Sequence, residues 1–115
     1  NWDYSTERNI MSRRVYWFGF VQLTIRQYFC GNLNNDTLQS KMAIEAIEKA
    51  IETMRKKPDG CNRVQAILLF YKKYSSYTMY GLADKFGVSW RTIQRWNSDF
   101  VYEVATNLGY RRKVA

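Results

Sequence analysis

Three polar side chains in the last quarter of the chain, Arg91, Gln94 and Arg95, have the types and the spacing to read DNA bases. In the major groove, arginine can pair with O6 and N7 of guanine, and glutamine with N6 and N7 of adenine. Residues three and four positions apart share one face of a helix, so these side chains would project together. Trp90 precedes them and either stacks on a base or sugar or covers the junction between two helices. We predict that these four residues form a base-reading face.

Six further side chains around this face could hold the DNA backbone. Their hydroxyl and ammonium groups are donors of the kind that contacts phosphate oxygens. The start of a helix also offers backbone N–H groups to a phosphate. The predicted backbone contacts are Thr78, Tyr80, Lys85, Ser89, Thr92 and Ser98.

All these residues lie in or next to residues 78–97, TMYGLADKFGVSWRTIQRWN, whose pattern predicts two helices joined by a tight turn. Ala83 is small where the two helices must cross closely. Gly87 lies four residues later, where a tight turn favours the positive φ that glycine adopts without cost. Ser89 is suited to cap the second helix. The predicted inner face consists of Leu82, Ala83, Val88, Ile93, Trp96, Phe100, Val104 and Leu108.

The rest of the chain also has helical patterns, so the predicted fold class is all-α. One proline and six glycines in 115 residues favour helices over strands and turns. Residues 21–26 alternate as a strand would, but no partner strand is evident. Asp36 is the expected N-cap of the second helix, whose apolar stripe would be Met42 or Ile44, Ile47, Ile51 and Met54. We expect helices over residues 12–30, 37–57, 62–74, 78–86 and 90–108.

The chain divides into two predicted parts. Residues 1–35 form an aromatic-rich helical segment for dimerisation or partner contact, and residues 36–115 form the DNA-binding domain. We expect the first segment and the helix over residues 37–57 to supply the dimer surface.

The basic charge is concentrated in the second half of the chain. The net charge is +8, and residues 61–115 carry nine Lys and Arg against three Asp and Glu. A basic segment that also carries a reading pattern indicates a polyanionic partner, here double-stranded DNA.

The residue types present also argue against enzymatic chemistry. Without histidine there is no His-based triad, and two distant cysteines cannot bind zinc on their own. No glycine-rich phosphate loop is found. We therefore predict no catalytic residue, no metal site and no cofactor. The apolar run over residues 15–21 is too short to span a bilayer, so we expect a cytoplasmic protein with no membrane partner.

Residues 82–96, LADKFGVSWRTIQRW, resemble the helix-turn-helix of bacterial repressors and of sigma factor region four. The wider run over residues 38–113 resembles phage late-gene transcriptional regulators of the ArpU and RinA kind. Those proteins have an amphipathic helix, an apolar helix ending in a Tyr-rich segment, the helix-turn-helix, and a long helix ending near Leu-Gly. The resemblance implies a phage or prophage DNA-binding regulator that activates transcription at the nucleoid of a bacterial host, with RNA polymerase as a further partner. Because one helix covers only a few base pairs, we also expect a homodimer on DNA.

Two other functions remain open on the sequence. One is a DNA-packaging or recombination adaptor of the terminase small-subunit kind, which would assemble into a ring. The other is a protein-binding module, such as a phage-encoded inhibitor or a polymerase-binding factor, whose basic face would contact protein.

Overall fold

The computed structural model describes residues 16–72 and 77–110, and all regular structure in those ranges is helical. This confirms the predicted all-α class. The predicted helices over residues 12–30 and 62–74 extend in part outside the described residues. The observed helices are α2 (Trp17–Phe29), α3 (Leu38–Arg55), α4 (Gly60–Tyr71), α5 (Met79–Phe86) and α6 (Trp90–Leu108).

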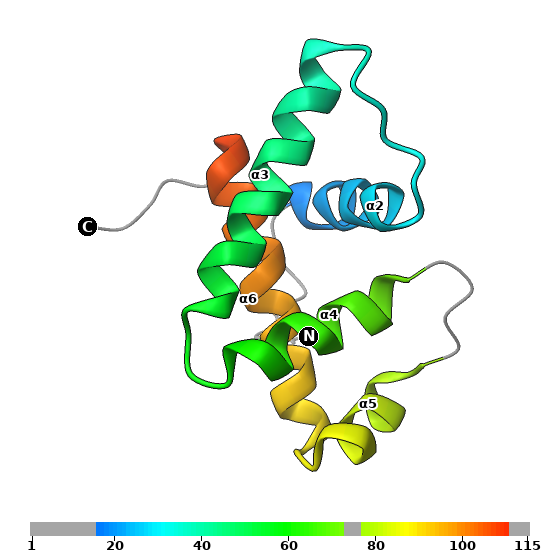
Figure 1. The fold of residues 1–115 in the computed structure, drawn as a ribbon, viewed down its shortest axis with the longest axis vertical. Coiled ribbons are helices and arrows are strands. Elements are labelled where there is room, and N and C mark those ends of the chain that lie inside the picture. Colours follow the sequence, from blue (N-terminus) through cyan, green and yellow to red (C-terminus); the bar gives the residue numbers. More distant parts are fainter. Residues whose placement is uncertain (1–15, 73–76, 111–115) are drawn as a thin grey trace.

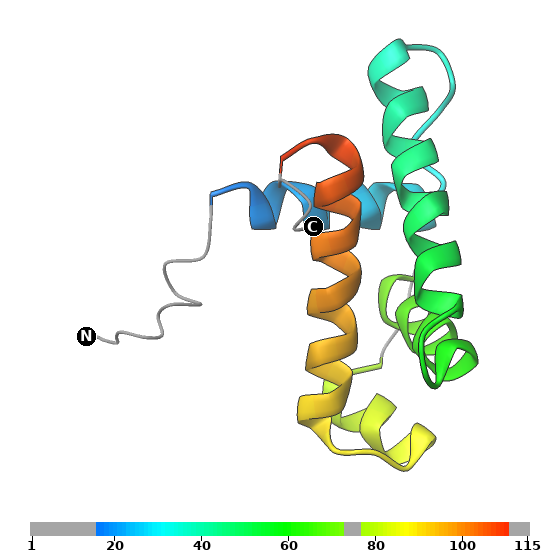
Figure 2. The same ribbon diagram turned by 90° about the vertical axis from the view of Figure 1, so that its left-hand side faces the viewer.

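Helix α6 is the longest helix and the axis of the fold. Helix α3 runs beside it, and α2 lies across the half of α6 that ends at Leu108 (Figures 1 and 2). Helices α4 and α5 lie against the other half, where α6 begins at Trp90. The two ends of α6 therefore pack against different helices.

The main core lies where α2, α3, α4 and α6 meet. Phe100, Val101 and Val104 of α6 are fully buried there, together with Ile25 of α2 and Ile47 of α3. Helix α2 packs into the same core as the helices after residue 36. The proposed difference in role between residues 1–35 and residues 36–115 therefore stays a prediction.

The inner face of α3 differs from the predicted stripe. Ala43, Ala46 and Ala50 are buried, whereas Met42 is 51% exposed. Ile47 and Met54 are buried as predicted, and Ile44 and Ile51 are partly buried, so only the Met42 alternative is wrong. Small side chains at the contact allow two helices to pack closely, so the alanines face the neighbouring helices and the stripe is rotated toward them.

A second, smaller core fixes α5 and the start of α6. It consists of Ala66 of α4, Leu82 and Ala83 of α5, and Ile93 and Trp96 of α6. The residues predicted for the inner face of residues 78–97 are found here, with Val88 partly buried against them. This cluster sets the angle at which α6 leaves the turn.

Two helix starts depart from the sequence prediction. Thr37, not Asp36, caps α3, because its backbone is extended and its hydroxyl accepts a hydrogen bond from the Ser40 N–H at 3.0 Å. Helix α4 begins at Gly60 rather than residue 62. A Cβ on Gly60 would lie 1.9 Å from the Arg55 carbonyl oxygen, so only glycine allows this close turn between α3 and α4.

Candidate nucleic-acid interface

The turn between α5 and α6 is built from local interactions that the sequence encodes. Gly87 has a φ of 69°, and the Val88 N–H donates to the Ala83 carbonyl at 3.0 Å, which ends α5. Ser89 caps α6 by accepting a hydrogen bond from the Thr92 N–H at 3.2 Å. The predicted roles of Gly87 and Ser89 in the turn are confirmed. The turn and the cap together fix the direction in which α6 begins.

The predicted base-reading side chains lie on the outer face of this first part of α6. Arg91, Gln94 and Arg95 are exposed, while Ile93 and Trp96 on the opposite face are buried. The structure thus brings the three polar side chains together on one side of a helix that is anchored from behind.

Trp90 belongs to an aromatic and cationic cluster at the beginning of α6. Its ring centroid lies 5.8 Å from that of Tyr80, and the Arg91 guanidinium carbon lies 5.7 Å from its centroid. Tyr80 is 66% exposed and Trp90 39% exposed. Trp90 therefore contacts α5 at the α5–α6 junction and is still partly accessible, so both of its predicted roles stay predictions.

Three of the predicted backbone contacts have hydroxyl groups that already take part in capping. Thr78 accepts a hydrogen bond from the Gly81 N–H at 3.0 Å and begins α5. The Ser89 and Thr92 hydroxyl oxygens lie 3.0 Å apart. Since a hydroxyl that accepts can also donate, Thr78 retains a proton for a phosphate. Lys85 is exposed and Ser98 is partly buried.

A groove of about 510 Å³ runs beside the reading face. Arg91, Gln94, Arg95 and Ser98 form its α6 wall. The other walls come from Phe18 and Gln22 of α2 and Met79 of α5, with Asn97 and Tyr102 of α6 also lining it. The sequence patterns gave no reason to place α2 next to the reading face.

The acidic group nearest to this region in the sequence is paired with a basic one. Asp99 Oδ2 lies 3.2 Å from Nη1 of Arg63, whose guanidinium carbon is also 5.8 Å from the ring centroid of Trp96. This ion pair reduces the negative field that Asp99 would otherwise present toward a phosphate. Asp84 of α5, beside Lys85, is exposed and carries a further negative charge among the predicted backbone contacts.

A buried polar network behind the reading face was not predicted from the sequence. The Tyr71 hydroxyl donates a hydrogen bond to the Asn97 side-chain oxygen and accepts one from Gln22 at 3.2 Å. Burial is the largest influence on the Tyr71 hydroxyl and raises its pKa to about 12. The only sequence signal was a polar residue, Asn97, directly after the buried Trp96.

Comparison with known proteins finds no matching family model, no matching curated protein and no matching solved structure. Across residues 16–72 and 77–110, no helix is long and apolar enough to cross a membrane. The same residues contain no group of three or more His, Cys, Asp or Glu side chains placed to hold a metal ion.

Proposed function

We propose that this chain binds double-stranded DNA in a sequence-specific manner, with α5 and α6 acting as a helix-turn-helix and α6 entering the major groove. The observation that supports the proposal best is the exposure of Arg91, Gln94 and Arg95 on one face of a helix anchored by Ile93 and Trp96. In such motifs the first residues of the second helix contact base edges.

In this proposal the bases are read by Arg91, Gln94 and Arg95, and the ring of Trp90 stacks on a base or sugar. Thr78, Tyr80, Lys85, Ser89, Thr92 and Ser98 position the DNA backbone. One helix covers only a few base pairs, so two copies would act together on a two-part site. A phage or prophage regulator of transcription that contacts RNA polymerase is the biological role that best fits such a protein.

The proposal is tested on the duplex that the chain selects from a random DNA library. We expect Arg91→Ala and Arg95→Ala each to weaken binding to that duplex by about 1–3 kcal/mol, because each removes a bidentate contact to a base. Fluorescence anisotropy at one fixed salt concentration measures the change.

The control is Lys41→Ala, which removes the same charge from an exposed position in the first turn of α3. It should change the affinity much less than either arginine substitution. If Arg91→Ala and Arg95→Ala bind the selected duplex as tightly as the parent, the assigned reading face is wrong.

A further inference from the structure

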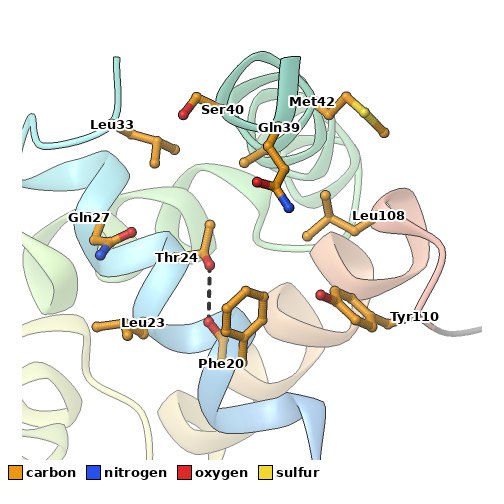
Figure 3. A pocket seen from close by; sticks show the side chains of 11 residues that line it. Phe20, Leu23, Thr24, Gln27, Leu33, Gln39, Ser40, Met42, Leu108 and Tyr110 are labelled. Atoms are coloured by element: carbon orange, nitrogen blue, oxygen red, sulfur yellow. Dashed lines mark hydrogen bonds between the residues drawn. The ribbon is translucent and has the colours of Figure 1, made fainter. Parts of the chain in front are cut away.

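An open groove lies at the other end of the molecule, between α2, α3 and the C-terminal end of α6. Its volume is about 530 Å³. Figure 3 shows Phe20 of α2, Gln39 of α3, and Leu108 and Tyr110 around this space. The lining residues are Phe20, Leu23, Thr24, Gln27, Leu33, Gln39, Ser40, Met42, Ala43, Leu108 and Tyr110.

Large apolar side chains are unusually exposed along this groove. Phe20 is 56%, Leu23 53%, Met42 51% and Tyr110 41% exposed. The Phe20 and Tyr110 rings contact each other, with their centroids 6.0 Å apart, and Tyr110 also stacks on Trp17 of α2 at 6.4 Å. Contiguous exposed apolar side chains of this kind mark a surface that another molecule covers.

We propose that a second copy of the chain covers this groove, so that two chains pair across a twofold axis. None of the eleven lining residues is charged, although the chain carries a net charge of +8. Two copies with so much like charge can approach most easily where their contact contains no charge at all. An apolar face is also complementary to itself, as a twofold interface requires.

The size of the groove sets the expected strength of the pairing. Stable interfaces use roughly 20–30 residues from each partner, and the groove offers eleven. We therefore expect a weak, reversible dimer rather than a permanent one, and we take a dissociation constant of about 1 µM to 1 mM, or roughly −8 to −4 kcal/mol, as the range to test.

The position of the groove suits the proposed DNA binding, and this step rests on that proposal. Arg91, Gln94 and Arg95 lie near the start of α6, whereas the groove is lined by Leu108 at its end. Figure 2 shows the full length of this helix between the two ends. Gln94 and Leu108 are fourteen residues apart on this helix, or about 21 Å at roughly 1.5 Å per residue. When two chains pair through the groove, their α6 helices extend away from the twofold axis. The two sets of Arg91, Gln94 and Arg95 can then lie about 34 Å apart, which is one turn of DNA.

The test is sedimentation velocity of the whole chain at concentrations from about 1 µM to 1 mM, the range taken for the dissociation constant. The parent should shift from the mass of one chain, 13.7 kDa, toward twice that mass. Phe20→Glu and Met42→Glu each place a charge in the groove and should stay monomeric. Both positions are half exposed, so thermal unfolding should change little.

The matched control is Leu68→Glu on α4, where the side chain is 42% exposed but does not line the groove. This variant should dimerise as the parent does. A parent that is monomeric throughout overturns the inference. Dimerisation that survives both groove substitutions, or assembly into a ring, overturns it as well.

DNA binding is measured separately on the same variants so that the two proposals can fail independently. Phe20→Glu and Met42→Glu should lose at least about tenfold in apparent affinity for a two-part site but keep the parent's affinity for a single half-site. Dimerisation without any DNA affinity would contradict the proposed function and leave the pairing surface intact. DNA binding by a parent that stays monomeric would contradict the pairing surface and leave the proposed function intact.

Discussion

Tyr71 is the residue that connects the candidate interface to the rest of the molecule. It lies on α4, is fully buried, and bonds to Gln22 of α2 and Asn97 of α6. Asn97 is 8% exposed and follows Trp96 on the helix that carries the reading face. The hydroxyl of Tyr71 therefore connects α2, α4 and α6 by two hydrogen bonds.

Removing the Tyr71 hydroxyl should lower the stability of the fold, although only one oxygen atom is lost. We expect Tyr71→Phe to lower the free energy of unfolding by about 1–3 kcal/mol, because the buried Asn97 oxygen loses its donor. Urea denaturation at neutral pH measures the loss. Tyr80→Phe removes the same atom from a side chain that is 66% exposed and should leave the stability unchanged. Equal stability of Tyr71→Phe and the parent would show that the network does not support the fold.

The same substitution should change the response to alkaline pH. Burial raises the pKa of Tyr71 to about 12 from the ordinary value of 10.0, so the folded chain holds this proton more tightly than the unfolded chain. The stability that follows from this difference is complete below pH 10 and is lost as the pH rises toward 12. Between pH 9 and 11, Tyr71→Phe should therefore lose about 1 kcal/mol less than the parent. A parallel decline in both proteins would contradict this assignment.

At the scale of the helices, glycine is required at the α5–α6 turn and is unfavourable in α2. Gly87 has a φ of 69°, which strains any residue with a Cβ, whereas Gly19 lies inside α2, where an added Cβ would meet nothing within 4 Å. We expect Gly87→Ala to destabilise the fold by about 1 kcal/mol and Gly19→Ala to stabilise it by about 0.5–1 kcal/mol. Thermal unfolding of the two variants measures the pair. Effects of the same sign would mean that backbone conformation is not what distinguishes these positions.

Helix ends and inner faces can be predicted from the sequence where local chemistry decides them. The roles of Gly87 and Ser89 are predictable because a positive φ and an N-cap are local requirements. Two other features depend on what the helix packs against. Ala43 faces inward instead of Met42 because α3 lies close to its neighbours, and Phe18 of α2 lines the groove beside the reading face. The amphipathic pattern of one helix does not indicate which other helix it packs against, so neither feature can be predicted from it.

At the scale of the whole molecule, α6 joins two surfaces of opposite character. Its first part presents Arg91, Gln94 and Arg95, and its last residue, Leu108, lines an uncharged apolar groove. Helix α2 lies across α6, with Phe18 beside the first surface and Phe20 beside the second.

This separation predicts how the intact chain should respond to salt. If the basic end binds duplex DNA, the logarithm of the affinity should fall linearly with the logarithm of the salt concentration, with a slope of about −0.9 for each phosphate neutralised. Each phosphate that a Lys or Arg side chain neutralises would therefore weaken binding about 3.5-fold between 50 and 200 mM salt. The pairing of two chains through the uncharged groove should instead stay constant or strengthen, because added salt screens the repulsion between copies of charge +8. Anisotropy and sedimentation over the same salt series measure the two responses. A DNA affinity that does not change with salt would favour a protein-binding module whose basic face contacts another protein. A dimer that dissociates as salt is added would mean that ion pairs hold the two chains together.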